Sequence, residues 1–255
     1  MFSEEINKVS MAAQGKINLL KKSKLRYLLA SALAGLYVGL GIMLIFTIGG
    51  VLNSAHSPAT KIVMGISFGV ALSLVIFAGA ELFTGNNFVM TVGFLKKTVS
   101  LGDLLSVWIF SFLGNVAGSV FGAWLYYSTG LATGPVGKFI TTTVSAKMNG
   151  SVHELFAKGV LCNILVCLAV WCSFKMKEEI GKLVMTFWCL FVFITAGFEH
   201  SVANMTLLAI GLFIPHPANV TVIGYIYNIG IVSLGNVVGG AIVLALPYFL
   251  ISKDK

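Results

Sequence analysis

Long stretches of this sequence contain no Asp, Glu, Lys or Arg, and the longest of them covers residues 201–252. A helix that spans a bilayer needs about 20 apolar residues, so this stretch alone is long enough for two. Only 10% of all residues are charged, whereas soluble domains carry about 25%. If this protein were soluble, it would lack the charged surface that soluble proteins expose to water. The sequence therefore predicts a polytopic membrane protein whose main partner is the lipid bilayer.

The apolar segments predict an all-α fold with six membrane-spanning helices. Charges and helix breakers divide the chain into expected spans at residues 27–48, 62–79, 104–127, 155–174, 183–197 and 222–251. Two further apolar segments, 83–95 and 201–214, are too short to cross alone. Because they follow the second and fifth spans directly, we expect both of those helices to be broken.

The distribution of basic residues predicts the orientation. Of the 17 Lys and Arg residues, Lys61, Lys138, Lys147 and Lys158 fall on one side of the membrane, and the others fall on the side of both termini. Cytoplasmic loops are enriched in Lys and Arg, so we expect both termini in the cytoplasm. Topology thus accounts for most of the net charge of +8. Aromatic and basic residues form no interleaved patch, so we expect no nucleic-acid partner.

Three parts of the chain are expected. Residues 1–26 are polar and of mixed charge, which predicts a cytoplasmic N-terminal segment that forms a helix at the membrane interface. Residues 27–252 form a single six-span domain, and residues 253–255 form a cytoplasmic tail. No short apolar core followed by a small-residue cleavage site is present, so we expect no signal peptide.

The sequence contains an internal repeat. A G-x-E-x4-N motif at residues 79–86 recurs at 197–204, and an L-G-N-V-x-G motif at 113–118 recurs at 234–239. The two copies, about 27–127 and 155–251, each hold three spans, so the second copy enters the membrane from the opposite side. Inverted repeats place the permeation site near the midplane, where paired helices are broken. The two G-x-E-x4-N segments are the expected breaks.

Three ionisable residues fall inside the predicted membrane region, where such groups are costly and usually functional. Glu81 and Glu199, with Asn86 and Asn204 after them, occupy equivalent repeat positions. This equivalence favours a structural task, because a carboxylate can accept N–H groups from unwound backbone. His200 has Leu82 as its counterpart, so symmetry does not require a histidine, although a hydrogen-bonded core histidine is the simpler alternative. An imidazole titrates near neutral pH, which suits a group that acts on a permeating acid.

Motifs for catalysis are missing from the sequence. It has no metalloprotease, nucleophile-elbow, P-loop or dinucleotide motif, and a haem anchor would need two facing membrane histidines. We therefore expect no enzyme activity, no metal and no cofactor.

Three segments carry a resemblance to a known family: AELFTGN at 80–86, GFEHSVANM at 197–205 and GNVVGG at 235–240. They resemble the formate/nitrite transporter family, over nearly the whole chain, and its hydrosulfide channel branch most of all. The resemblance implies an aquaporin-like protomer in a homopentamer, placed in a bacterial cytoplasmic membrane. It also implies one pore in each protomer for small monovalent anions of weak acids, hydrosulfide first, then formate or nitrite.

The resemblance further implies two sets of site residues. The pore and substrate residues are His200, Thr84, Lys147, Asn163 and Asn236. The apolar constrictions are Leu82 on the cytoplasmic side and Phe68, Leu72 and Phe193 on the outer side. Two of these residues have a simpler alternative: Lys147 could be an ordinary solvated loop residue, and Thr84 could do no more than cap the following helix.

The expected mechanism follows from the cost of moving a bare anion through an apolar constriction, several kcal/mol or more. Lys147 would attract the anion, and Thr84 and His200 would orient it. His200 would then protonate it or donate hydrogen bonds to it. A proton-coupled secondary transporter shares these features, and so does an aquaporin-like channel for neutral solutes, although the chain lacks NPA boxes at its breaks. A gating role for Lys16 and the N-terminal segment stays open.

Overall fold

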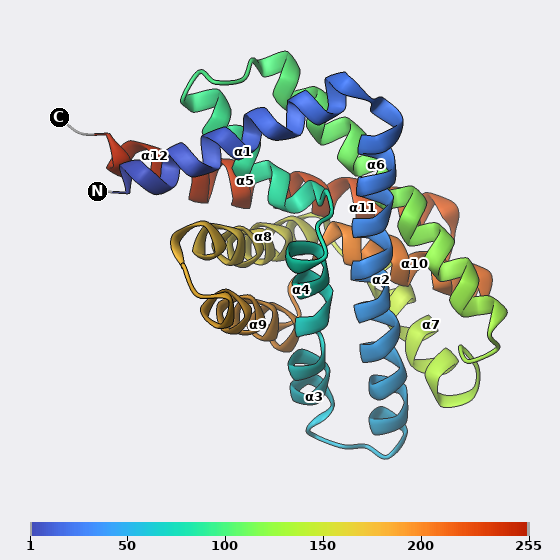
Figure 1. Cartoon of the computed structure of the whole chain (residues 1–255). Coiled ribbons are helices and arrows are strands. Elements are labelled where there is room, and N and C mark those ends of the chain that lie inside the picture. The colour runs from blue at the N-terminus through green and yellow to red at the C-terminus, as the bar shows by residue number, and fades with distance from the viewer. Residues whose placement is uncertain (1, 254–255) are drawn as a thin grey trace.

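The structure is a computed structural model that describes residues 2–253, and its elements are helices joined by short connections (Figure 1). Residues 254 and 255 of the expected cytoplasmic tail lie outside the described residues. The described part contains no strand. Six helical segments are long and apolar enough to cross a membrane, which confirms the predicted all-α, six-span architecture.

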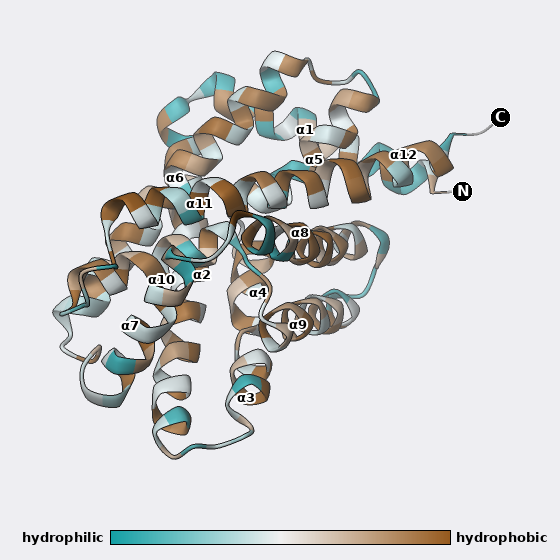
Figure 2. Cartoon of the chain, turned by 180° about the vertical axis from the view of Figure 1, so that it is seen from behind, coloured by the Kyte–Doolittle hydropathy of each residue, from teal (hydrophilic) through white to brown (hydrophobic). Residues whose placement is uncertain are grey.

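Four of the six spans are single helices, and the other two are interrupted. The uninterrupted spans are α2 (Lys24–Ser54), α6 (Leu101–Ser128), α8 (Val152–Lys175) and α9 (Glu179–Ala196). The second span consists of α3 (Thr60–Ser67) and α4 (Gly69–Phe77), and the sixth of α11 (Val222–Val237), the π-helix η1 (Val238–Ala245) and α12 (Leu246–Ser252). Figure 2 shows these helices coloured as hydrophobic over most of their length.

Four shorter helices complete the fold: α1 (Ser3–Lys22), α5 (Phe83–Leu95), α7 (Gly134–Met148) and α10 (Ser201–Phe213). Helices α5 and α10 follow the two breaks, as the sequence predicts. Helix α1 lies on the face where both termini meet, which we call the terminal face, and α7 lies on the opposite face (Figure 1). Helix α7 lies between the third and fourth expected spans, where the sequence predicts only a connection.

The inverted repeat is visible in helix packing. Gly118 on α6 lies against the carbonyl of Ala32 on α2, and Gly239 on η1 lies against the carbonyl of Val160 on α8. A Cβ at either glycine would overlap that backbone, so the two helices of each pair approach as closely as small residues permit. Helices α1 and α7 each precede one copy of the repeat and lie on opposite faces.

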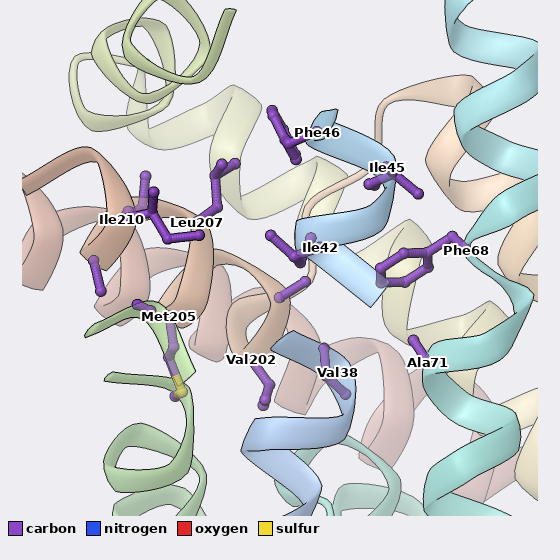
Figure 3. Packing of buried hydrophobic residues seen from close by; sticks show 14 of the residues in the cluster. Val38, Ile42, Ile45, Phe46, Phe68, Ala71, Val202, Met205, Leu207 and Ile210 are labelled. Atoms are coloured by element: carbon purple, nitrogen blue, oxygen red, sulfur yellow. The ribbon is translucent and has the colours of Figure 1, made fainter. Parts of the chain in front are cut away.

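The hydrophobic core joins the two repeats. Val38, Ile42 and Ile45 on α2 pack with Phe68 between α3 and α4 and with Val202 on α10 (Figure 3). A second cluster lies at the terminal face, where the apolar side of α1 packs against α5 and α8. Helix α1 therefore covers protein on its apolar side.

Candidate permeation site

Each break begins with a glycine whose backbone conformation is easily adopted only by a residue without a side chain. Gly79 has φ 80° and Gly197 has φ 78°, both in the left-handed region. Nothing lies within 4 Å of where a Cβ would stand on either residue. Backbone conformation, not lack of space, therefore requires glycine at the start of the G-x-E motif.

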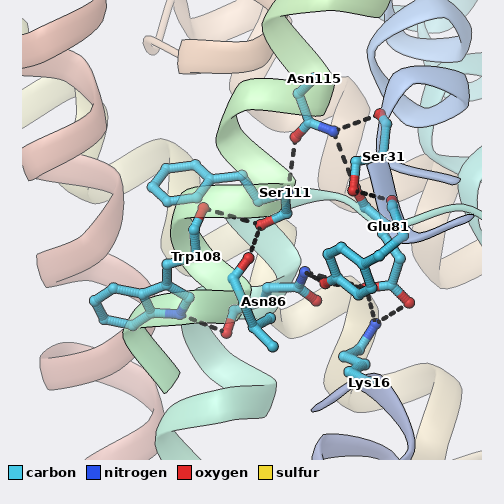
Figure 4. Close-up of polar contacts among 10 residues, drawn as sticks. Lys16, Ser31, Glu81, Asn86, Trp108, Ser111 and Asn115 are labelled. Atoms are coloured by element: carbon cyan, nitrogen blue, oxygen red, sulfur yellow. Dashed lines mark hydrogen bonds and ion pairs between the residues drawn. The ribbon is translucent and has the colours of Figure 1, made fainter. Parts of the chain in front are cut away.

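Asn115 on α6 holds the first break in place (Figure 4). Its Oδ1 accepts the N–H of Phe83 at 2.9 Å, and its Nδ2 donates to the carbonyls of Ser31 at 2.7 Å and Glu81 at 2.9 Å. One buried side chain thus satisfies three backbone groups around unwound chain, which lipid cannot do. The asparagine of the first L-G-N-V-x-G motif is a clamp on the break.

Asn236 performs the same task at the second break. Its Oδ1 accepts the N–H of Ser201 at 2.9 Å, and its Nδ2 donates to the carbonyls of Gly159 at 2.8 Å and Glu199 at 3.1 Å. The resemblance implied that Asn236 contacts the permeating anion. In the structure all of its side-chain hydrogen bonds go to backbone, so its bonding pattern is that of a clamp.

The carboxylate of Glu81 receives three donors at the first break. Lys16 on α1 donates to both carboxylate oxygens at 2.9 and 2.8 Å, and the Tyr27 hydroxyl and the Asn86 amide donate to Oε2 at 2.9 and 3.2 Å (Figure 4). The side chains of Lys16 and Glu81 are 19% and 14% exposed. Helix α1 is thereby tied to the broken second span.

Glu199 has an equivalent ion pair at the second break. Lys147 on α7 donates to its Oε2 at 2.6 Å, and Asn204 donates to the same oxygen at 2.6 Å. Asn204 also donates to Asn228 on α11, whose amide donates to the Lys147 carbonyl. Lys147 is the residue expected to attract anions, and its positive charge is thus compensated by a buried carboxylate. Both glutamates occupy equivalent positions, as the repeat predicts, but the donors described for each carboxylate are side chains and not N–H groups of unwound backbone.

His200 and Thr84 meet between the two breaks. The Nδ1 of His200 accepts the backbone N–H of Ala203 at 3.0 Å, so the ring caps the N-terminus of α10. Its Nε2 lies 3.0 Å from Thr84 Oγ1, at the N-terminus of α5. Because Nδ1 is an acceptor, Nε2 carries the proton and donates it to the threonine hydroxyl. The Thr84 hydroxyl proton is then free to face a third group.

Apolar side chains enclose this pair. The ring of Phe193 stacks on His200 with centroids 5.8 Å apart, and packs edge-on against Phe68 at 5.7 Å. A central cavity of about 10 Å³ is lined by these three residues and by Leu72, Leu82 and four further apolar residues. That volume is about the minimum for one water molecule, so the path is closed to larger species in this conformation.

A much larger cavity of about 640 Å³ lies on the terminal side, which we call the terminal cavity. Its lining includes Lys16, Glu81, Leu82 and Leu72. Leu72 and Leu82 line both cavities and so form the wall between them. The resemblance placed Leu72 with the outer constriction, whereas Phe68 and Phe193 line only the central cavity among the cavities described.

Asn163 on α8 lies behind Thr84 and is fully buried. Its Nδ2 lies within hydrogen-bond distance of the carbonyls of Thr84 and Asn236 and of Asn87 Oδ1, at 3.2, 2.6 and 3.1 Å. Its Oδ1 has no partner within the described residues. Asn163 therefore links the start of α5 to α11 and retains one acceptor for a further group.

Sequence reasoning missed two members of the site. Asn115 lies in the repeated motif, and the repeat was the signal that could have paired its role with that of Asn236. Tyr27 lies at the start of the first span, and no local pattern connects it with Glu81, because the two residues are 54 positions apart.

Comparison with known proteins decides the family. A model of the family described as formate/nitrite transporter matches residues 3–250 of this chain. The chain belongs to the formate/nitrite transporter family. Among curated members, the nitrite transporter NirC of Escherichia coli is 42% identical over 250 residues, which cover 98% of this chain and 92% of that protein. A probable formate transporter of Methanothermobacter thermautotrophicus is 37% identical over 243 residues, with 88% of each chain covered.

Solved structures of the family agree with the fold. An FNT family ion channel superposes with a TM-score of 0.93 at 40% identity, covering 98% of this chain and 99% of that one. A pentameric formate channel with formate bound superposes with a TM-score of 0.77 at 26% identity, covering 91% and 98%. The family is one of membrane transporters and channels, and the six spans make this protein a multi-pass membrane protein.

Proposed function

We propose that this protein is a passive channel that carries small monovalent anions of weak acids through one pore in each protomer of a homopentamer. The observation that carries the proposal is the His200–Thr84 hydrogen bond, enclosed by apolar side chains where the two broken helices begin. The pentameric formate channel among the structural relatives supports the assembly. The distribution of Lys and Arg supports a cytoplasmic terminal face.

The electrostatics of the pore come from backbone as well as from lysine. Helices α5 and α10 both begin at the central pair, and a helix N-terminus carries a partial positive charge that favours anions. Lys147 is held by Glu199, so the two together present a nearly neutral mouth. An anion is therefore drawn to the centre mainly by the ends of the two half-helices.

His200 acts on the anion through the hydrogen bond that it donates to Thr84. Its Nδ1 lone pair is occupied by the Ala203 N–H, and a second proton on the ring would replace that bond with a repulsive contact. The neutral ring donates through Nε2 to Thr84, and the Thr84 hydroxyl donates to the anion. Of the two acts expected for His200, the contacts favour hydrogen bonding over protonation.

Nitrite is the substrate that sequence similarity favours, because the relatives at 42% identity are named nitrite transporters. The resemblance to the hydrosulfide channel branch favours hydrosulfide, and formate is in the name of other relatives. All three are small monovalent anions. A single flux assay that compares them in proteoliposomes ranks them directly.

The function is tested by His200→Asn, with His216→Asn as the matched control because the His216 side chain is exposed. We expect flux of all three anions to fall in His200→Asn and to equal wild type in His216→Asn. Wild-type flux with wild-type pH dependence in His200→Asn would overturn the site. Accumulation that disappears when the proton gradient is collapsed would indicate a coupled transporter, and osmotic swelling without anion flux would indicate a water or neutral-solute channel.

A further inference from the structure

Four basic residues lie at the junction of α1 and α2: Lys21, Lys22, Lys24 and Arg26, which we call the basic elbow. Ser23 joins the two helices, and its Oγ accepts the N–H of Arg26 at 3.3 Å. All four basic side chains are exposed. Residues 6–80 contain no Asp or Glu, so local sequence supplies no counter-charge.

Among the residues that the structure describes, one carboxylate pairs with the elbow. Lys21 pairs with Asp103 at the start of α6, with 2.7 Å between Nζ and Oδ1. Within residues 2–253, Lys22, Lys24 and Arg26 have no carboxylate partner. Lys16 pairs with Glu81 and Lys182 with Glu179, whereas Lys96, Lys97 and Lys177 have no carboxylate partner in the described part of the chain either. Three unpaired positive charges within one turn of chain favour an external anion.

Apolar surface begins directly beside these charges. Leu25 and Leu29 on α2 are 67% and 58% exposed, and Ile109 on the neighbouring helix α6 is 55% exposed. Lys24 Nζ lies 5.8 Å from the ring centroid of Phe110 on α6, which places its charge over the seam between the two helices. A cationic end next to an exposed apolar seam matches the chemistry of one molecule, an anionic phospholipid.

We propose that the basic elbow binds the phosphate headgroup of an anionic phospholipid, with its acyl chains lying along the exposed seam of α2 and α6. Topology alone requires positive charge on this face, and it does not require three charges to be left unpaired at one site. Basic clusters next to a spanning helix are the common recognition element for anionic lipids. The elbow joins α1, which carries Lys16, to α2, so a lipid bound there contacts both helices.

The test is native mass spectrometry of the purified oligomer, released from nanodiscs of phosphatidylcholine with one fifth phosphatidylglycerol. The variant Lys22→Gln, Lys24→Gln, Arg26→Gln leaves the Lys21–Asp103 pair intact. The matched control Lys96→Gln, Lys97→Gln, Lys177→Gln removes the same charge from exposed residues elsewhere in the chain. Each lost charge weakens binding to an anionic lipid by about fivefold, so we expect about 100-fold weaker phosphatidylglycerol retention in the elbow variant, and nearly wild-type retention in the control.

A competition experiment separates the possible ligands. Added glycerol phosphate or inorganic phosphate should not displace phosphatidylglycerol, because neither has acyl chains for the seam. Displacement by inorganic phosphate at similar concentration would overturn the lipid assignment in favour of a free-anion site. Equal loss of lipid in both variants would show a diffuse charge effect and overturn the site. Loss of the oligomer in the elbow variant alone, with lipid retention per protomer unchanged, would identify the elbow as a contact between copies of the chain and would also overturn it.

Discussion

Replacing Asn236 by alanine tests whether this residue is a clamp or a contact for the anion. The change removes the Oδ1 acceptor and the Nδ2 donor of Asn236. It leaves three backbone groups without their partner: the Ser201 N–H and the carbonyls of Gly159 and Glu199. Asn236 is fully buried, so bulk water does not replace it. The clamp interpretation therefore predicts a loss of stability before any effect on permeation.

The size of that loss is bounded by two figures. Hydrogen bonds inside membrane proteins contribute about 0.6 kcal/mol each on average, which gives about 2 kcal/mol for three. A buried polar group left unsatisfied costs about 1–3 kcal/mol, which gives about 9 kcal/mol as the upper bound. Asn236→Ala should therefore lower the free energy of unfolding by at least about 2 kcal/mol, and Asn115→Ala should do the same at the first break.

The assay is reversible unfolding in mixed detergent micelles, followed by circular dichroism, with flux measured in parallel. Asn149→Ala is the matched control: its amide also donates to two carbonyls, but it is exposed, so water replaces those bonds. We expect it to cost less than about 1 kcal/mol. An Asn236→Ala protein with wild-type stability and reduced anion flux would refute the clamp and make Asn236 a permeation residue, as the family resemblance implied.

Three further sets of variants test the ion pair, the helix packing and the constriction of the site. Lys147→Met and Glu199→Gln should each cost about 3 kcal/mol, because each strands a largely buried charge, and the double variant should unfold less easily than either; a double variant less stable than both would contradict the pairing. Gly118→Ala should lose about 1–3 kcal/mol or more through overlap with the Ala32 carbonyl. Gly15 on α1 has no atom within 4 Å of where a Cβ would stand, so Gly15→Ala should raise the free energy of unfolding, measured by thermal unfolding, by up to about 1 kcal/mol. If Gly118→Ala and Gly15→Ala changed this free energy in the same direction, the space around the new Cβ would not explain the effect. Phe193→Ala removes the ring stacked on His200 and should raise acetate flux relative to formate flux, and an unchanged ratio would place the size limit elsewhere.

The breaks were predictable because their chemistry is local. A glycine at positive φ, an acid beside unwound backbone and an asparagine at a fixed spacing stand within one short motif, and the motif occurs twice. Helix ends were less predictable. Helix α2 continues to Ser54 beyond the expected end at residue 48, because a spanning helix extends past the apolar core of the bilayer into polar residues. Helix α7 was missed because its threonine-rich stretch has no long apolar run, although one side of the helix is buried.

The partners of the charged residues were not predictable from the sequence. Lys16 and Glu81 are 65 positions apart, and Lys147 and Glu199 are 52 apart. Each pair forms only when α1 or α7 folds over a break, which is a property of the assembled repeat. The π-helix η1 also depends on assembly, because Gly240 fits against Asn163 and Cys167 on α8. Local sequence shows a glycine pair there and nothing of the neighbour that requires it.

These ion pairs change how an anion would be selected. Free lysines at the two mouths would attract any anion in proportion to its charge, and a divalent anion most strongly. Each lysine instead lies against a carboxylate, so a divalent anion gains little at the mouth and still has to lose its hydration at Leu82 or Phe68. The centre offers one neutral histidine, one hydroxyl and two helix N-termini, whose partial charges match about one negative charge. For the proposed channel we therefore expect selectivity for monovalent anions, because charge is compensated at the entrances and only dipoles face the anion inside.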